Sequence, residues 1–396
     1  IAGLIMSQRV NLNLKNELFL YGAKDWNQCF QCGNCTATCH TTENDFFFPR
    51  KTVRQVLMGL EKSLQTNIDP WLCTYCGDCS RTCPRDANPA EMMMSIRRYL
   101  ISVYDWTGIS KLLYKSKALE IAAILILAVI VMVLYLLYTT FPAGDTAQWI
   151  GPDGGALINK MAPWKTIHLG DLIMAGGLVF LIVTNIFYMW YKIIYEDKSL
   201  KVGFADYLRP ISLLTKIFHR DKKYAKCDEK KLFLYWGLHL FLALSYALMF
   251  VIIVFFLEWF QTDNVYPIYH PQRLLGYIST IGLFVGIIYF YINRTIKNME
   301  NSKYSHFTDW TFLVLLFLTT LTGILVHFFR VYGLPQLTYI TYLLHLMVLV
   351  PMLIVEVPFS KWSHMIYRPF SLYFAHLKKL AIKNQKIILN NYSLQS

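Results

Sequence analysis

Eight of the nine cysteines stand in two short runs in the first quarter of the chain, and both runs have the same spacing. Two residues separate neighbouring cysteines among the first three of each run, and three residues separate the third from the fourth. This spacing is typical of bacterial proteins that hold two cubane 4Fe-4S clusters, because three closely spaced thiolates can reach three irons of one cube. The cysteines are Cys29, Cys32, Cys35, Cys39, Cys73, Cys76, Cys79 and Cys83.

The fourth cysteine of each run is expected to cross over to the neighbouring cube. One cluster would then take Cys29, Cys32, Cys35 and Cys83, and the other would take Cys73, Cys76, Cys79 and Cys39. Gly33 and Gly77 each follow the second cysteine of their run, where the backbone has to pass close to a cube. Pro84 follows the last cysteine, as the pattern asks, whereas His40 stands at the equivalent position of the first run.

Two other roles for these cysteines fit the sequence less well. A disulfide framework suits a small secreted domain, and nothing in this largely apolar chain looks secreted. Zinc is the stronger alternative, because paired CxxC motifs often bind it. A tetrahedral zinc site, however, has no need of a third cysteine at the same spacing and a fourth three residues on, repeated twice. The sequence therefore favours iron–sulfur clusters.

The rest of the chain is unusually apolar, with 55% hydrophobic residues over 396 positions and a mean hydropathy of +0.36. Six apolar segments are each long enough to cross about 30 Å of hydrocarbon. They are residues 118–140, 166–192, 232–259, 271–292, 309–331 and 337–360. We therefore expect a mainly α protein with a small helical dicluster ferredoxin domain at residues 1–105, a six-helix transmembrane bundle at 106–370 and a basic tail at 371–396.

The net charge of +13 is concentrated in alternate loops. Residues 192–231 hold eleven lysines and arginines, whereas residues 141–165, 260–270 and 332–336 hold only Lys160 and Lys165. The positive-inside rule then places the cysteine domain, the basic loops and the C-terminus in the cytoplasm, with the chain in the inner membrane. Since topology accounts for the charge, we expect no nucleic-acid partner. We also expect that residues 1–28 are not a secretory signal and that Cys227, in a basic loop, is a plain thiol.

Two helices are expected in the cysteine domain. Apolar residues recur with helical periodicity between Val53 and Leu64, and they predict one helix that starts near Pro49. A second amphipathic helix is expected in the sequence NPAEMMMSIRRYLISVYDW, which leads toward the first apolar segment. The cubes would fill much of the core of so small a domain.

Five histidines fall in or beside the apolar segments, where an ionisable side chain is costly and suggests a function. They are His168, His239, His270, His327 and His345. Histidines that face each other across a helix bundle can hold b-type haems, although a lone membrane histidine is more often a hydrogen-bonding partner between helices. Several such histidines beside two cubanes favour haem. Glu356 lies eleven residues after His345, on the same helix face, and could serve a haem, a proton path or a quinone, or simply bond between helices.

Two stretches resemble known families. Residues 29–85, with FPRKTVRQVLMG and WLCTYCGDCSRTCP, resemble the iron–sulfur C-type subunits of heterodisulfide reductases. Residues 232–370 resemble the gamma subunit of respiratory nitrate reductase and its relatives, through LTGILVHFFRVYG, the 18-residue step between two histidines, and VPFSKWSHMIYRP. The fusion of the two modules resembles the membrane subunit family of the quinone-interacting membrane-bound oxidoreductases (Qmo) of sulfate reducers.

The nitrate reductase resemblance implies haem ligands at His239, His327 and His345, with a further histidine ten residues after the first. Met249 occupies that position here. We expect His239 and His345 to hold an inner b haem.

For an outer b haem, we expect His270 to stand opposite His327, with His168 as the substitute candidate. His364 recurs in the family pattern without being a ligand there. We interpret it as a residue at the cytoplasmic interface.

The resemblance implies an electron-transfer subunit of a quinone-interacting oxidoreductase. Menaquinone would exchange electrons with the haems, and the cubanes would connect them to cytoplasmic flavin and iron–sulfur subunits and to adenylylsulfate reductase. The chain shows no G-x-G-x-x-G motif and no CCG module, so we expect the substrate-reducing site on another polypeptide. The alternatives are a membrane arm for a heterodisulfide reductase-like or sulfite-reduction complex, a membrane redox sensor, which would need an output module, and a purely structural anchor.

Overall fold

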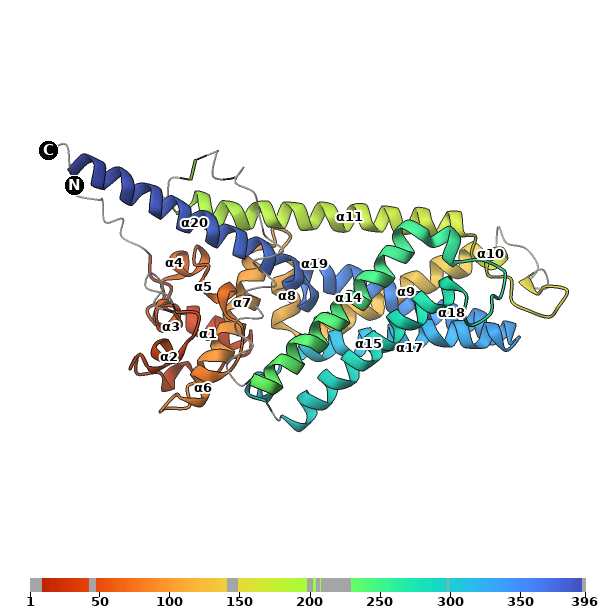
Figure 1. Ribbon diagram of the computed structural model, residues 1–396, viewed down its shortest axis with the longest axis horizontal. Coiled ribbons are helices and arrows are strands. Elements are labelled where there is room, and N and C mark those ends of the chain that lie inside the picture. Colours follow the sequence, from red (N-terminus) through yellow and green to blue (C-terminus); the bar gives the residue numbers. More distant parts are fainter. Residues whose placement is uncertain are drawn as a thin grey trace.

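The computed structural model describes residues 9–42, 48–140, 149–197, 202–203, 207, 229–297 and 299–393 (Figure 1). Within these residues the chain is built from helices, and its extended pairing is a single bridge between Ile150 and Ala156. The expected mainly α fold is therefore confirmed. Cys227 and most of the basic stretch around it lie outside the described residues.

The N-terminal domain consists of short helices separated by the cysteine loops, followed by one long helix. The helices are α1 (Leu14–Phe19), α2 (Asn34–Thr38), α3 (Arg50–Leu57), α4 (Glu61–Gln65), α5 (Asp69–Leu72), α6 (Asp78–Arg81) and α7 (Pro89–Tyr104). Helix α7 confirms the second helix expected in this domain. It is buried along most of its length, and Met92, Met93 and Ile96 are fully enclosed.

The single helix expected between Val53 and Leu64 is wrong, because two helices, α3 and α4, stand there. Gly59 separates them with a φ of +66°, the left-handed conformation that commonly ends a helix. A Cβ at Gly59 would lie 2.4 Å from the carbonyl oxygen of Asn11, so the chain also passes too close here for a side chain. The apolar periodicity continues through the break because both helices pack on the same core.

Among the described residues, six helices are long and apolar enough to cross a membrane, and they match the six expected segments. They are α9 (Lys117–Thr140), α11 (Trp164–Trp190), α14 (Glu229–Phe260), α15 (Pro271–Ile296), α17 (Phe307–Val331) and α18 (Pro335–Pro351). Helix α18 runs on through a π-helical turn (Met352–Glu356) and α19 (Val357–Phe359). Their outward faces carry large apolar side chains such as Leu134, Ile173 and Phe255, as a lipid environment requires. The chain is a membrane protein.

The N-terminal domain sits at one end of the bundle, and α11 runs along the bundle's length (Figure 1). Helix α17 packs against α18, α14 against α15, and α9 against α18. The last helix, α20 (His364–Ser393), leaves the bundle and returns over the N-terminal domain, crossing residue 370 without a break.

One hydrophobic core joins the N-terminal domain to the membrane helices. Trp71 from α5 and Tyr104 from α7 pack against Tyr367 from α20, with ring centroids 5.7 and 5.8 Å from that of Tyr367. Met189, near the end of α11, and Ile193, in the π-helical turn that follows it (Tyr191–Tyr195), belong to the same buried cluster. The two parts of the chain are therefore not connected by a simple linker, since residues of both complete the same core.

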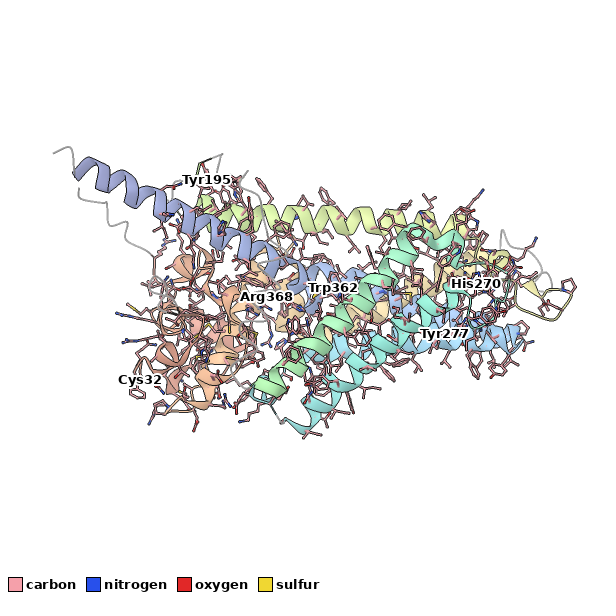
Figure 2. The ribbon with its side chains drawn as sticks, viewed as in Figure 1. Cys32, Tyr195, His270, Tyr277, Trp362 and Arg368 are labelled. Atoms are coloured by element: carbon pink, nitrogen blue, oxygen red, sulfur yellow. The ribbon has the colours of Figure 1, made fainter. Side chains whose placement is uncertain are left out.

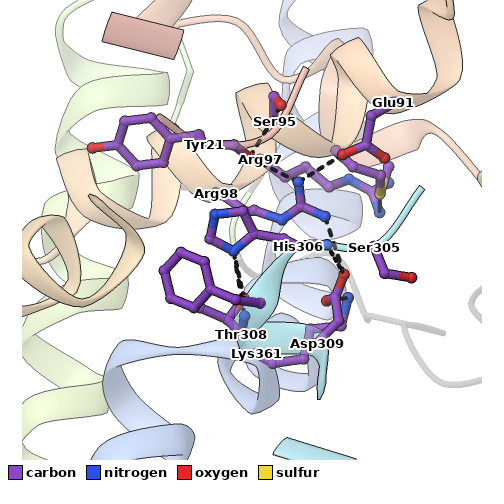
Figure 3. Close-up of polar contacts among 12 residues, drawn as sticks. Tyr21, Glu91, Ser95, Arg97, Arg98, Ser305, His306, Thr308, Asp309 and Lys361 are labelled. Carbon is purple, nitrogen blue, oxygen red and sulfur yellow. Dashed lines mark hydrogen bonds and ion pairs between the residues drawn. The ribbon is translucent and has the colours of Figure 1, made fainter. Parts of the chain in front are cut away.

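A buried ion cluster also spans the junction (Figure 3). Arg98 on α7 donates to Glu91 at 2.8 Å and to Asp309, in the first turn of α17, at 3.2 Å. Asp309 also faces Lys361 at 2.5 Å and Arg294 at 3.8 Å. Because Arg98, Glu91 and Asp309 are all buried, each charge depends on its partners to offset the loss of water.

His306 adds a neutral contact to this junction. It caps α17, and its Nε2 faces the carbonyl oxygen of Leu20 at 3.4 Å. Burial, together with the positive charge of Arg98, lowers the pKa of His306 to about 3, so the ring is neutral at physiological pH. The polar side of the junction is thus specified by three elements: α7, the start of α17 and the N-terminal segment.

Replacing Arg98 by methionine should lower the free energy of unfolding by about 3–5 kcal/mol, because it removes the cation paired with the buried Glu91 and one of the three cations around the buried Asp309. Denaturant titration of the full chain in detergent, followed by tryptophan fluorescence, measures this change. Arg54→Met is the control, since Arg54 lies exposed on α3 and its loss should change stability by no more than about 0.5 kcal/mol. Equal stability of the two variants would show that the Arg98 cluster does not hold the domains together.

Candidate functional site

The eight cysteines line two separate hollows in the N-terminal domain. The inner hollow, with about 420 Å³ of empty space, is lined by Cys39, Cys73, Cys76 and Cys79. The outer hollow, with about 400 Å³, is lined by Cys29, Cys32, Cys35 and Cys83. Each run thus sends its fourth cysteine to the hollow of the other run, which is the division that the spacing predicts.

Left-handed residues bend the cysteine loops around the hollows. Gly33 and Gly77, with φ of +91° and +87°, each precede the short helix that carries the third cysteine of a run. Gln31 and Tyr75 also have positive φ, at +62° and +59°. This curvature turns polar groups toward sulfur, and the backbone N–H of Tyr75 lies 3.3 Å from the Sγ of Cys73.

Further donors face other cysteine sulfurs. The backbone N–H of Ala87 lies 3.4 Å from the Sγ of Cys83, and the hydroxyl of Thr41 lies 2.9 Å from that of Cys39. Hydrogen bonds to the sulfurs are one of the means by which a protein sets the potential of an iron–sulfur cluster.

The donor set fits a multi-iron group better than a single ion. Among the described residues, no three His, Cys, Asp or Glu side chains are grouped closely enough to hold one metal ion. The sulfurs instead surround a space, as four ligands to different irons of a cube must. Burial raises the pKa of Cys35 to about 11 and also raises the pKa of Cys73 and Cys79, so these side chains need bound metal to be present as thiolates.

The two hollows differ in exposure. Cys73 and Cys79 of the inner hollow are buried, whereas Cys32 of the outer hollow is exposed and lies at the end of the molecule remote from His270 (Figure 2). The inner hollow also abuts the membrane part of the chain. A Cβ at Gly77 would lie 2.2 Å from the Cβ of Glu300, in the short helix α16 (Glu300–Lys303) between two membrane helices.

At the end of the bundle nearest the N-terminal domain, two histidines face each other. The ring of His239 on α14 lies 6.3 Å, centroid to centroid, from the ring of His364 at the start of α20. The Nδ1 of His364 contacts the carbonyl oxygen of Lys361, which can only accept, so Nδ1 carries the proton and Nε2 keeps its lone pair. Burial and the charge of Lys361 lower the pKa of His364 to about 3, which keeps the ring neutral. These are the features of a metal-ligating histidine.

His345 is also held in one tautomer. Its Nδ1 lies 2.9 Å from the hydroxyl of Thr322, and that hydroxyl donates to the carbonyl oxygen of Leu318 at 2.7 Å. The hydroxyl therefore accepts from Nδ1–H, and the Nε2 of His345 keeps its lone pair. The ring lies against Gly323, where a Cβ would come within 3.2 Å of it.

The three outer histidines have separate surroundings. The Nε2 of His327 lies 2.8 Å from the hydroxyl of Tyr277 and 3.1 Å from Arg273, which can only donate, so its lone pair is already in use. His270 stacks on Tyr266 with ring centroids 4.0 Å apart. His168 lies edge-on to a tryptophan ring of its own helix. In this arrangement His327 does not fit as a haem ligand opposite His270.

Sequence reasoning missed the part that His364 plays in this arrangement. Its family pattern suggested an interface residue, whereas the structure sets its ring beside that of His239. The signal that could have found it is depth: His239 lies near the start of the third apolar segment, and His364 follows the end of the sixth by only a few residues, so antiparallel packing puts both at the same end of the bundle.

Comparison with known proteins identifies the cysteine domain. Residues 25–87 match the family described as a 4Fe-4S dicluster domain. The second C-type iron–sulfur subunit of CoB–CoM heterodisulfide reductase from Methanocaldococcus jannaschii is 35% identical over 101 residues, which are 24% of this chain and 54% of that protein. A protein from Archaeoglobus profundus that is named as like the C-type subunit of heterodisulfide reductase is 32% identical over 84 residues, 21% of this chain and 45% of that protein.

The C2-type subunit of an H₂/formate:CoB-CoM heterodisulfide,ferredoxin reductase from Methanococcus maripaludis is 39% identical over 69 residues, 17% of this chain and 37% of that protein. The chain thus spans about half or less of the length of the curated relatives it matches. The N-terminal part is a 4Fe-4S dicluster domain similar to the C-type subunits of heterodisulfide reductases, joined here to six helices that can cross a membrane.

Alanine at Gly33 and at Gly77 should have different effects on iron content. Both variants place a side chain in the left-handed region, at a cost of about 1–2 kcal/mol. Only Gly77→Ala also brings its methyl group against Glu300, so it should lose about half of the bound iron while Gly33→Ala keeps nearly all of it. Iron and sulfide assays on the purified chain measure this.

Adding Glu300→Gly to Gly77→Ala removes the atom that the new methyl group meets, and it should restore the iron. Equal losses in the two single variants would show that the contact between the inner hollow and α16 does not matter.

Proposed function

We propose that this protein carries electrons between the membrane and soluble partner subunits through two 4Fe-4S clusters. The observation that supports this most directly is the pair of four-cysteine hollows in a domain whose core continues into the membrane helices. The clusters supply one-electron redox chemistry when they are bound. The protein holds their ligands in a fixed position relative to the bundle.

The two clusters would have different positions in this route. The outer cluster, held by Cys29, Cys32, Cys35 and Cys83, lies toward solvent and is the one that a soluble partner can approach. The inner cluster, held by Cys39, Cys73, Cys76 and Cys79, lies toward the membrane. Because each run contributes a ligand to both clusters, the clusters stay close to each other.

The membrane end of the route would be a b haem between His239 and His364. His239 and His364 would hold this group, since their rings lie 6.3 Å apart, centroid to centroid, on two different helices and the Nε2 of His364 keeps its lone pair. The haem would supply one-electron redox chemistry at the membrane end. The nitrate reductase resemblance instead implies His345 as the partner of His239. An outer haem would require His327 to release Tyr277 and Arg273.

Packed aromatic side chains join the segment that carries Cys73 to the helix that carries His364. Trp71 lies two residues before Cys73 and contacts both Tyr104 and Tyr367. Tyr367 lies one helical turn from His364 on α20. This packing excludes water and fixes the separation of the two redox sites, and both conditions favour electron transfer.

The resemblance to Qmo membrane subunits supports menaquinone as the membrane reductant or oxidant, with cytoplasmic flavin and iron–sulfur subunits and adenylylsulfate reductase beyond the clusters. The chain would be the membrane subunit of that oxidoreductase, in the cytoplasmic membrane, with the cluster domain inside. The named relatives favour a second candidate, the membrane arm of a heterodisulfide reductase-like complex.

Mass spectrometry of the copurified complex separates the two candidates. Two flavoprotein partners would support the first, and a partner with CCG modules would refute it in favour of the second.

Cys73→Ala should remove one of two cubane signals from the electron paramagnetic resonance spectrum and leave any haem spectrum largely intact, because the change affects the inner hollow alone. Cys227→Ala, which changes the one cysteine outside both runs, is the control and should leave both signals. An unchanged cluster count in Cys73→Ala would contradict the ligand assignment.

His364→Ala and His345→Ala should differ in haem content. If His239 and His364 are the ligands, the first variant loses the b haem and the second keeps it, as measured by the pyridine haemochrome assay. The opposite result would indicate that His345, and not His364, is the haem ligand. No haem in the unaltered protein would refute the haem proposal and leave the clusters unaffected.

A further inference from the structure

Two glutamates lie buried at the end of the membrane bundle nearest the N-terminal domain. Glu120, in the first turn of α9, and Glu356, which ends the π-helical turn after α18, both have 0% exposed surface. Burying an ionised carboxyl group at such a place costs free energy unless the group is paired or protonated. The hydrogen bonds of each glutamate therefore indicate which of the two is ionised.

Glu120 has a donor for each of its oxygens. The hydroxyl of Thr311 on α17 lies 2.9 Å from one oxygen, and the hydroxyl of Ser360 donates to the other at 3.2 Å. Hydrogen bonds of this kind favour the ionised form of a carboxyl group. Glu120 is therefore the better stabilised carboxylate of the two.

The backbone N–H of Lys361 donates to Oε2 of Glu356 at 3.2 Å. Within the described part of the chain, Oε1 is buried and has no hydrogen-bond partner. The hydroxyl of Ser360 lies beside this carboxyl group as well as beside Glu120. A single hydroxyl hydrogen cannot be donated to both, so an ionised Glu356 would keep an unsatisfied buried oxygen.

The charged groups around the two glutamates balance only when one carboxyl group is protonated. Arg98 and Lys361 both pair with Asp309, and Arg98 also binds Glu91 (Figure 3). Arg294 lies 3.8 Å from Asp309 and is the third cation. With Glu120 and Glu356, four carboxyl groups face three cations. The neighbouring His306 is neutral, and the buried hydroxyl of Tyr114 adds no charge. The cluster is electrically neutral when the four carboxyl groups hold a single proton.

We propose that Glu120 and Glu356 form a proton-binding site in which one proton is shared and resides mainly on Oε1 of Glu356. Protonation removes the charge from the one oxygen of Glu356 that has no partner, and Ser360 keeps its hydrogen for the ionised Glu120. No electron is transferred and no bond other than O–H changes when the site gains or loses its proton.

The site is connected to the inner hollow by polar contacts. Lys361, whose backbone binds Glu356, pairs through its side chain with Asp309. Asp309 binds Arg98, which binds Glu91. The hydroxyl of Tyr75, a residue that lines the inner hollow, donates to Glu91 at 2.9 Å. Protonation at the glutamate pair therefore changes the electrostatic field at both ends of this chain of contacts.

Infrared spectroscopy of the full-length protein in lipid nanodiscs tests the proposal through the carbonyl stretch of a protonated carboxyl group, which shifts in D₂O. Glu356→Gln should remove this band. Glu120→Gln should remove it too, because three cations then face three carboxylates and Ser360 is free to donate to Glu356. Glu17→Gln is the control and should leave the band, since Glu17 is ion-paired with Lys115 at 2.7 Å.

An unchanged band in Glu356→Gln would refute Glu356 as the proton-binding group. An unchanged band in Glu120→Gln would refute the sharing of the proton between the two glutamates. Ser360→Ala provides a milder variant if the glutamines prevent folding. It should keep the proton but shift the band, because Glu120 loses one of its two donors and takes a larger share of the proton, and an unshifted band would count against the sharing. The measurement reads a carboxyl group, so it can succeed or fail independently of haem and cluster assays on the same samples.

Discussion

The salt bridge from Arg98 to Glu91 and Asp309 is the interaction on which the arrangement of this protein depends. It joins the long helix of the cluster domain to the first turn of a membrane helix, and it does so out of contact with water. Buried ion pairs contribute little net stability, but they tolerate little displacement, because any movement leaves a charge unpaired. A protein that passes electrons between fixed groups benefits from such a junction, since the separation between its redox sites must not vary.

The apolar side of the same junction gives the two hollows different environments. Trp71, Tyr104 and Tyr367 pack together in the core that also holds the buried Cys73 of the inner hollow, while the outer hollow keeps an exposed cysteine. Burial and hydrogen bonds to sulfur are the means by which a protein differentiates two clusters with the same ligands. The fold thereby gives one cluster an environment like that of the bundle and the other an environment like that of a soluble ferredoxin.

Parts of this structure follow from the sequence because they are determined locally. Cysteine spacing predicts the two ligand sets since each loop wraps its own metal group, and hydropathy predicts the six membrane helices since lipid requires continuous apolar stretches. The break at Gly59 did not follow, because periodicity does not report backbone conformation. The contact of His239 with His364 and the bridge from Glu120 to Ser360 join residues 125 and 240 positions apart, and only the packing of the bundle brings them together.

Helix α20 has a consequence for how the protein is made. The N-terminal domain leaves the ribosome first, yet Tyr367, Phe374 and Leu377 of the last helix complete its core. Until those residues are synthesised, Trp71 and the wall behind the inner hollow lack their cover. The domain can therefore reach its final form only after all six membrane helices have been inserted. The order of biogenesis that follows is membrane insertion, then closure by α20, with the interval between them available for the delivery of iron and sulfide.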